Sequence, residues 1–438
     1  MQRLFNRAVE SPLVRGGLTL MIGVITGSAL GVLRVALTAY LLGTRGRADS
    51  LAVALGPLDT FNSMLVNSML FAFVPLLTAR SGAQKLALFH KLSRAFALVF
   101  TVITLALLIA SPWLMRILAP GLAEPYFTDS VQILRILSIS TFFVAEASIY
   151  SALLFTDRRF APTAFYQAAL NVCTIVCALA LWKAMGVYAF AFGYTLGSAA
   201  QLAIVFYATR RQRVEAEPAV CDLRLREVIA KPAFFAVYAA GLALNITFTR
   251  AWATHLGSGM AAALDYCMRG VGVPLALLVT PISNSLLPEI ARLRSLNKMR
   301  EVVRLVDRTL ALTALAAIAG CAFALVFRRP AVALFFQRGN FTAESTRLVS
   351  AVFLGLGPCF VGWALLEITA RSLFAINRHW PPVVAAAIPV VTNVAVTLRL
   401  SAGRPELLGV GATAGYAAGF LALFAMAHMH RRRWLSEQ

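Results

Sequence analysis

Long uninterrupted apolar stretches are the feature that most constrains how this chain can fold. About twelve of them are long enough to cross a bilayer as helices, which takes roughly 20 residues each. They lie near residues 18–42, 50–77, 95–115, 129–155, 162–183, 187–208, 232–255, 261–290, 309–327, 346–374, 382–400 and 407–429. Because the stretches are continuous and do not alternate with polar residues, they favour helices over a β-barrel. We therefore expect an all-α membrane protein with about twelve transmembrane helices.

The positive charges are distributed unevenly between the connections. The net charge is +21, which by itself would suit a nucleic-acid partner. Most of the 40 Lys and Arg residues, however, fall in alternate connections between the apolar stretches, such as 80–94, 210–231, 292–308 and 431–433. Cytoplasmic loops carry this excess of basic residues. We therefore predict no nucleic-acid partner, a multi-pass protein of the bacterial cytoplasmic (inner) membrane, and both termini in the cytoplasm.

The two halves of the chain repeat each other. "NSMLFAFVP" from Asn67 corresponds to "NSLLPEIAR" from Asn284, and "GYTLG" from Gly193 corresponds to "GYAAG" from Gly415. The longest hydrophilic segment lies between the halves. We expect an N-terminal six-helix bundle in 1–209, a basic cytoplasmic linker in 210–231 and a C-terminal six-helix bundle in 232–438.

An even number of helices in each half makes the two copies parallel repeats. Transporters built in this way bind substrate at the repeat interface and rock one half against the other. A membrane-embedded enzyme, such as a glycosyltransferase, is the alternative of a different class. The sequence shows no nucleophile beside a base and no acidic motif on an outer loop, so we predict a transporter without enzymatic activity or catalytic residues. The cysteines and histidines lack metal-ligand spacing, and we expect no metal site.

Few ionisable residues lie inside the apolar stretches. Such residues are costly in lipid and normally face protein or a watery cavity. Asp265 and Arg269, and likewise Glu367 and Arg371, are four residues apart and can pair on one helix face. Arg34 has no acidic neighbour on its own helix, so its partner must come from elsewhere. Other candidates for the cavity or gate are Asp49, Asp59 and Arg250.

The charged set within the spans contains more arginines than carboxylates and no lysine. Guanidinium groups bind phosphate through two parallel hydrogen bonds and stay charged at physiological pH. A cavity of this kind suits a phosphorylated or pyrophosphorylated substrate. A cation-coupled drug exporter, the alternative within the transporters, would need a cavity rich in carboxylates.

Prolines interrupt the second apolar stretch of each half at repeat-related positions. Pro57 and Pro274 are such a pair. Prolines in membrane helices are often tolerated as simple kinks, but a kink can also act as a hinge between two conformations. We predict a hinge role for both.

Several motifs occur in the order found in one known family. They are "GSALGVLRVALTAYLLGTRGRADSLAVAL" (27–55), "FAFVPLL" (71–77), "YCMRGVGVPLALL" (266–278), "SNSLLPEIAR" (283–292) and "LFFQRGNFTAEST" (334–346). With these motifs the chain resembles the MurJ family of lipid II flippases, in the multidrug/oligosaccharidyl-lipid/polysaccharide exporter superfamily. The resemblance implies a V-shaped pair of six-helix bundles that works by alternating access. It implies transport of a polyprenyl-pyrophosphate-linked saccharide, lipid II or a similar peptidoglycan precursor, from the cytoplasmic to the outer leaflet.

The resemblance also implies roles for individual residues. Arg34 and Arg269 match the family's arginines for the pyrophosphate, with Arg250 as a further candidate, and Asp49 matches a gate position. The chain departs from the family at Val35, where an aspartate is usual, and near Asn62, where an arginine is usual. It also ends after its twelfth span, whereas many members carry two more helices. For this reason, a flippase for an exopolysaccharide or O-antigen-type oligosaccharide remains the alternative substrate assignment.

The expected partners follow from this function. They are the lipid-linked saccharide, membrane lipids and enzymes of cell-envelope biosynthesis, and we expect a monomer. We expect no cofactor, and consider an ion gradient or the membrane potential as the energy source.

Overall fold

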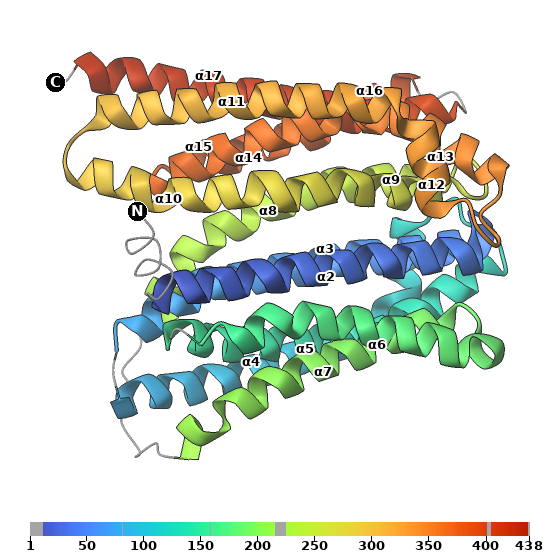
Figure 1. Ribbon diagram of the computed structural model, residues 1–438, viewed down its shortest axis with the longest axis horizontal. Coiled ribbons are helices and arrows are strands. Elements are labelled where there is room, and N and C mark those ends of the chain that lie inside the picture. Colours follow the sequence, from blue (N-terminus) through green and yellow to red (C-terminus); the bar gives the residue numbers. More distant parts are fainter. Residues whose placement is uncertain (1–11, 81, 158, 215–224, 401–403, 437–438) are drawn as a thin grey trace, which may run out of the picture. The chain divides into compact units, whose positions relative to one another are not determined.

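The computed structural model describes residues 12–80, 82–157, 159–214, 225–400 and 404–436, which form helices joined by short turns and contain no strand (Figure 1). In chain order the helices of the first half are α2 (Pro12–Leu42), α3 (Gly46–Thr78), α4 (Gly82–Leu118), α5 (Tyr126–Thr156), α6 (Ala161–Met185) and α7 (Tyr188–Val214). Those of the second half are α8 (Leu225–Ala253), α9 (Met260–Pro274), η1 (Leu275–Val279), α10 (Thr280–Ser295), α11 (Met299–Val326), α12 (Arg328–Phe336), α13 (Ala343–Leu356), α14 (Cys359–Ala375), α15 (Trp380–Ala385), α16 (Ala387–Leu400), η2 (Pro405–Leu407) and α17 (Val410–Ser436).

The predicted all-α membrane fold is confirmed. Within the described residues, ten helices are long and apolar enough to cross a membrane, and the bent pair α13 and α14 brings the number to eleven. The stretch predicted at 261–290 is also helical, but it is divided into α9, η1 and α10. Large apolar side chains remain exposed along these helices, for example Ile109 on α4 at 80%. Such surfaces are compatible with lipid and would be a liability in water.

The chain forms two compact units. The first contains Met1–Thr38, Ala54–Arg116 and Glu124–Ala233, and the second contains Ala39–Val53, Ile117–Ala123 and Phe234–Gln438. The start of α3 and the turn before it therefore belong to the second unit, although they come early in the sequence. Residues 215–224, in the middle of the expected linker, lie outside the described residues.

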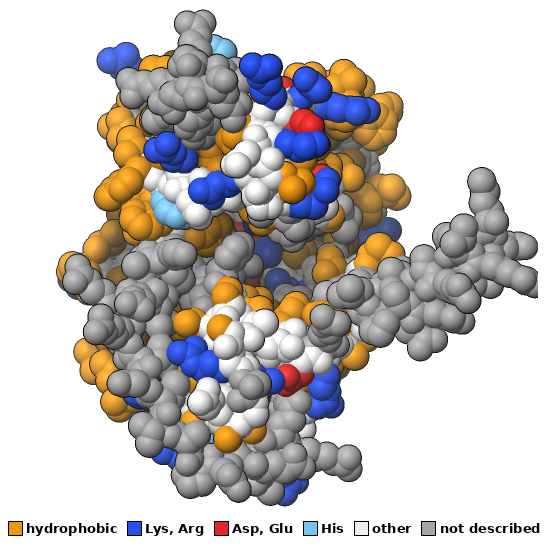
Figure 2. All heavy atoms as spheres, turned by 90° about the vertical axis from the view of Figure 1, so that its left-hand side faces the viewer, with side chains coloured by type: hydrophobic (Ala, Val, Ile, Leu, Met, Phe, Trp, Pro, Cys, Tyr) orange, Lys and Arg blue, Asp and Glu red, His pale blue; other side chains and the backbone are white. Residues whose placement is uncertain are grey.

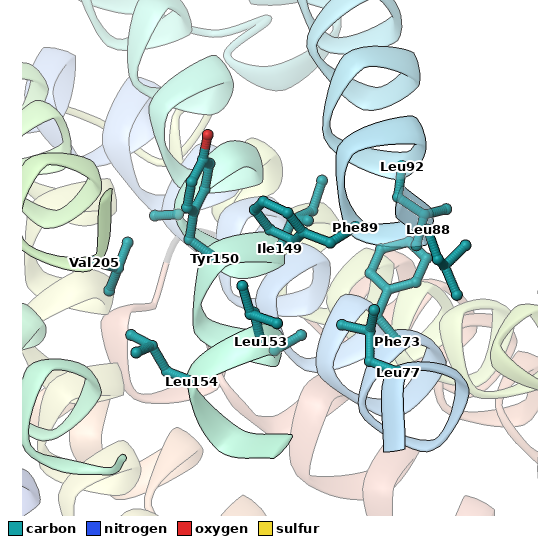
Figure 3. Packing of buried hydrophobic residues seen from close by; sticks show 12 residues of the cluster. Phe73, Leu77, Leu88, Phe89, Leu92, Ile149, Tyr150, Leu153, Leu154 and Val205 are labelled. Carbon is teal, nitrogen blue, oxygen red and sulfur yellow. The ribbon is translucent and has the colours of Figure 1, made fainter. Parts of the chain in front are cut away.

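A cluster of buried apolar residues holds the first unit together (Figure 3). Phe73 of α3 and Phe89 of α4 pack there with Tyr150 of α5, and the rings of Phe89 and Tyr150 meet edge to face with centroids 5.1 Å apart. Val205 adds α7 to the cluster. Aromatic pairs with this geometry contribute about 0.5–1.5 kcal/mol beyond their buried area. The cluster thus joins four helices of the first unit.

The repeated "GYTLG" and "GYAAG" motifs lie where helices approach closely. A Cβ atom at Gly197 of α7 would come within 2.7 Å of the Cα atom of Leu170 on α6. In the second unit, a Cβ atom at Gly415 of α17 would come within 2.5 Å of the carbonyl oxygen of Pro389 on α16. Small residues four apart allow membrane helices to pack at short distance. The two motifs therefore serve the same packing purpose in their own units.

In the second unit, basic side chains gather around the turn between α10 and α11. Arg292 and Arg294 lie in the last turn of α10, and Lys298 precedes α11. In the first unit, Lys85 of α4 forms an ion pair of 2.5 Å with Asp157 after α5. Figure 2 views the molecule from the end that carries the α10–α11 turn, and it shows Lys and Arg side chains across the described surface.

Candidate functional site

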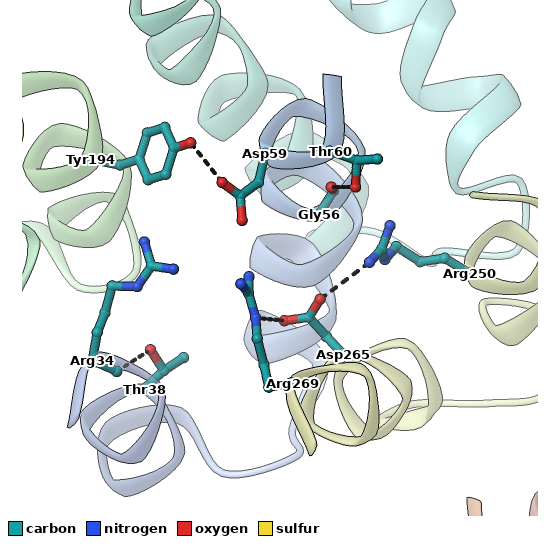
Figure 4. A network of polar contacts seen from close by, with 9 residues as sticks. All are labelled: Arg34, Thr38, Gly56, Asp59, Thr60, Tyr194, Arg250, Asp265 and Arg269. Carbon is teal, nitrogen blue, oxygen red and sulfur yellow. Dashed lines mark hydrogen bonds and ion pairs between the residues drawn. The ribbon is translucent and has the colours of Figure 1, made fainter. Parts of the chain in front are cut away.

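Arg34 lies buried on α2, in the first unit, with a side chain from α7 beside it. Only 6% of Arg34 is exposed, and its guanidinium carbon lies 5.9 Å from the centroid of the Tyr194 ring. The hydroxyl of Tyr194 donates a hydrogen bond of 2.8 Å to Oδ1 of Asp59 on α3 (Figure 4). A cation over an aromatic face is stabilised by the ring quadrupole, more so when it is desolvated. The structure therefore brings the predicted residues Arg34 and Asp59 into one cluster through Tyr194.

A polar pocket of about 220 Å³ adjoins this cluster within the first unit. Helices α3, α5, α6 and α7 form it. Its lining consists of Asp59, Asn62, Ser63, Val66, Val144, Tyr166, Gln167, Leu170, Tyr194 and Gln201. Of these, only Asp59 was predicted as a site residue. Polar residues inside otherwise apolar stretches, such as Gln167 and Gln201, were the available sequence signal for the others.

The second unit holds a cluster of two arginines on one carboxylate. Asp265 of α9 lies 3.2 Å from Arg250 of α8 and 3.7 Å from Arg269, one turn further along α9 (Figure 4). The side chain of Arg250 is 5% exposed and that of Arg269 is 30% exposed. One carboxylate balances one of the two guanidinium charges, so the cluster keeps a net positive charge. Arg269 is the more accessible of the two cations.

Glu367 and Arg371 form the ion pair that their spacing predicted. Nε of Arg371 donates to Oε1 of Glu367 at 2.6 Å, and both side chains are largely buried on α14. This pair neutralises its own charge. A net anionic ligand is therefore attracted less by this pair than by the arginine cluster at Asp265.

Asp49 holds the start of α9. Its carboxylate accepts hydrogen bonds from the backbone N–H groups of Gly259, at 2.5 Å, and Ala262, at 2.8 Å. Asp49 is only 2% exposed. The first N–H groups of a helix have no partners within the helix, and a carboxylate there also complements the helix dipole. Asp49 therefore acts as a cap on α9, although it belongs to another helix.

Further bonds within the second unit surround this cap. Tyr266 of α9 donates to the carbonyl oxygen of Gly43 at 2.8 Å. Asn340, in the "RGNFT" motif, donates through its side chain to the carbonyl oxygen of Leu41 at 2.7 Å. Hence the "RGNFT" motif and the α2–α3 turn meet in one hydrogen-bonded group. We call Asp49, Gly259, Ala262, Tyr266 and Asn340 the turn clamp.

The two predicted hinge prolines differ in their surroundings. Pro57 lies inside α3, one turn after the boundary between the units at Val53 and Ala54. Thr60 donates its hydroxyl to the carbonyl oxygen of Gly56 there, an arrangement that often bends helices. Pro274 ends α9, and the π-helical turn η1 follows it directly. Pro274 therefore lies where the helix type changes, whereas Pro57 lies inside a continuous α-helix.

The structure describes no candidate metal centre. Among the described residues, no group of three or more His, Cys, Asp or Glu side chains could hold a metal ion.

The fold is shared with solved transporters. A structure of lipid II flippase MurJ in an inward closed conformation matches with a TM-score of 0.81 at 17% identity, over 94% of this chain and 87% of that chain. An inward-facing MATE family transporter of the MOP superfamily matches with a TM-score of 0.80 at 12% identity, over 93% of this chain and 96% of that chain. At these identities the likeness establishes the fold.

Sequence similarity identifies the family. A probable lipid II flippase MurJ from Rhizobium meliloti (strain 1021) is 30% identical over 435 residues, covering 92% of this chain and 78% of the relative. The lipid II flippase MurJ of Burkholderia cenocepacia is 28% identical over 373 residues, covering 80% of this chain and 72% of the relative. The sequence profile of the family described as "Lipid II flippase MurJ" matches residues 38–438. The chain therefore belongs to the MurJ family.

Proposed function

We propose that this protein moves lipid II from the cytoplasmic to the outer leaflet of the bacterial inner membrane, without changing it chemically. Family membership supports the substrate. The observation that carries the mechanism is the arginine cluster on Asp265, which combines a net positive charge with an accessible guanidinium on Arg269. The substrate's pyrophosphate is the anionic group that such a cluster attracts.

Arg34 and Arg269 are the proposed pyrophosphate ligands. Each is placed within its own unit by a neighbouring side chain: Tyr194 lies beside Arg34, and Asp265 lies beside Arg269. Arg250, which is more deeply buried, has its charge balanced by Asp265 and positions that carboxylate. Arg250 therefore contributes to the site by holding Asp265 in position, and Arg269 is the cation available to the substrate.

Alternating access is the proposed transport cycle, with the turn clamp as the outer gate. The clamp joins the α2–α3 turn to α9 inside the second unit, while most of α2 and α3 belongs to the first. In the proposed cycle these bonds break when the outer side opens. Pro57 and Pro274 are the proposed hinges, since Pro57 lies inside α3 near the unit boundary and Pro274 lies where α9 gives way to the π-helical turn η1.

Both termini are proposed to lie in the cytoplasm. The basic residues around the α10–α11 turn support this orientation, because cytoplasmic connections are enriched in Lys and Arg. A green fluorescent protein fused after Gln438 is expected to fluoresce in the bacterium. Activity of an alkaline phosphatase fused at the same point would contradict the orientation.

Complementation tests the function as a whole. A bacterial strain depleted of its own lipid II flippase is expected to grow when it expresses this chain. Expression of the Arg34→Ala variant at the same membrane abundance should not restore growth. Rescue of only a strain that lacks an exopolysaccharide flippase would contradict lipid II as the substrate.

A further inference from the structure

The polar pocket of the first unit is not explained by pyrophosphate binding. Its polar lining includes one carboxylate (Asp59), three amides (Asn62, Gln167 and Gln201), one serine hydroxyl (Ser63) and two phenols (Tyr166 and Tyr194). Asn62, Tyr194 and Gln201 are buried, and burying polar groups is unfavourable unless they find hydrogen-bond partners. The pocket is therefore a candidate ligand site with both donors and acceptors.

The side-chain oxygen of Asn62 is the atom that most strongly indicates a bound ligand. It is 3% exposed and lines the pocket, and its Oδ1 atom has no hydrogen-bond partner among the described residues. Its Nδ2 atom donates a long hydrogen bond of 3.3 Å to the Ser140 hydroxyl, and its side chain also forms a hydrogen bond with Tyr194. Gln167 and Gln201 are joined to each other by a similarly long bond of 3.4 Å. These amides can accept and donate further hydrogen bonds.

The mixture of groups matches sugar hydroxyls better than a metal ion. A hard cation requires a shell of oxygen ligands with several negative charges, whereas this lining has one carboxylate, which already accepts from Tyr194. A sugar hydroxyl donates and accepts at once, and so it can satisfy an amide and a carboxylate together. The tyrosine rings add apolar faces for a sugar ring.

The pocket's size limits the ligand to about one sugar ring. Its volume is about 220 Å³. Sites for drug-sized ligands have volumes of roughly 300–1,000 Å³. The whole headgroup of a lipid-linked saccharide would not fit, so only one part of that headgroup can occupy the pocket.

The position of Arg34 indicates which part. Its guanidinium carbon lies 5.9 Å from the ring of Tyr194, and Tyr194 also lines the pocket. In a polyprenyl-pyrophosphate-linked saccharide, one sugar is bonded directly to the pyrophosphate. We propose that the pocket formed by Asp59, Asn62, Gln167, Tyr194 and Gln201 is the subsite for this first sugar. This inference rests on the proposed role of Arg34 as a pyrophosphate ligand.

Binding of two lipids to the purified full chain in nanodiscs tests the subsite. The lipids are undecaprenyl pyrophosphate, which has no sugar, and lipid II. We expect the wild-type protein to bind lipid II more tightly. Asn62→Leu and Gln167→Leu should each lower lipid II affinity about five- to tenfold, the effect of losing one or two hydrogen bonds. Both variants should leave the affinity for undecaprenyl pyrophosphate unchanged.

Matched controls separate this subsite from general damage. Gln132→Leu makes the same change on α5 at an exposed position that does not line the pocket, and it should alter neither affinity. Gln167 is itself exposed, so its replacement leaves buried packing intact. The unchanged affinity for undecaprenyl pyrophosphate reports that each variant is folded.

The outcomes distinguish the subsite from the proposed function. Arg34→Ala should weaken binding of both lipids by a similar factor. If it does so while the pocket variants leave the lipid II preference intact, the sugar subsite is wrong and the pyrophosphate site stands. Equal affinity of the wild-type protein for the two lipids would also overturn the subsite. If Arg34→Ala changes neither affinity, the proposed pyrophosphate ligand is wrong.

Discussion

Asp49 and Gly259 are joined by a hydrogen bond of 2.5 Å between a carboxylate and a backbone N–H group, although 210 residues separate them in the chain. The same carboxylate also accepts from Ala262. The start of α3 is thereby held to the start of α9 inside the second unit. A contact built from one carboxylate and two backbone amides can be broken and formed again without rearranging an apolar core.

Removing this carboxylate should loosen the turn clamp. Asp49→Ala deletes both hydrogen bonds, and each bond to a charged group contributes about 1.5–3 kcal/mol. Asp49→Asn keeps an acceptor but loses the charge that complements the helix dipole. We expect the melting temperature of the purified protein to fall by about 5 °C or more for Asp49→Ala and by less for Asp49→Asn.

Asp307→Ala provides the control, because Asp307 is an exposed acid on α11. It should melt like the wild type. A melting temperature of Asp49→Ala equal to that of wild type would show that the clamp contributes no stability.

The two arginines on Asp265 should respond differently to substitution. Arg269→Ala removes the accessible cation and should abolish rescue of a flippase-depleted strain at normal membrane abundance. Arg269→Lys keeps the charge but loses the paired hydrogen bonds to phosphate, so we expect partial rescue. Arg250→Ala removes the closer of the two cations from Asp265, whose side chain is largely buried, and leaves only the more distant Arg269 in the cluster. Because a buried carboxylate that loses its ion-pair partner destabilises the fold, we expect this variant to be less abundant in the membrane.

Western blots of the membrane fraction, read beside growth, measure both effects. Arg116→Ala is the matched control, since Arg116 is exposed in the last turn of α4. Full rescue by Arg269→Ala would exclude this residue as a required pyrophosphate ligand.

Much of the fold could be predicted because membrane spans are set by the length of apolar sequence. Every predicted stretch is helical in the structure, and most helix ends lie within a few residues of the expected ones. The interruptions were harder to predict. The break between α13 and α14 lies at Gly357 and Pro358, but membrane helices also tolerate such residues without breaking. Whether a helix bends at a proline depends on its neighbours, which local sequence does not specify.

In the candidate site, contacts within one helix could be predicted from the sequence, whereas contacts between distant helices could not. The Glu367–Arg371 pair was predictable, because four residues along one helix bring the side chains together. The partner of Arg34 was predicted only to lie elsewhere, and the structure places the Tyr194 ring beside it. Likewise, no local pattern indicated that Asp49 caps α9. Contacts between distant helices depend on how the helices pack, and a single sequence gives little information on that.

The repeated glycines should tolerate no large side chain. Gly197→Leu would place atoms against the backbone of Leu170, and Gly415→Leu would do the same at Pro389. Both variants are expected to fall several-fold in membrane abundance, because α6 and α7, or α16 and α17, could no longer pack. Gly320→Leu is the control, since a Cβ atom there meets nothing within 4 Å. Normal abundance of Gly197→Leu on immunoblots would contradict the close packing.

Replacing a proposed hinge proline should slow transport without lowering the stability of the protein. Pro57→Ala restores a backbone N–H group inside α3 and removes the clash of the proline ring with the preceding turn, a change that favours a straighter helix. We expect an unchanged or higher melting temperature, but lipid II translocation in proteoliposomes that is slower by a factor of about ten, because a stiffer α3 resists the change between conformations. Pro75→Ala is the control: Pro75 lies inside the same helix but near its other end, far from the unit boundary at Val53 and Ala54, and its replacement should leave the translocation rate unchanged. Equal slowing by both substitutions would indicate a general effect of proline removal and exclude a specific hinge at Pro57.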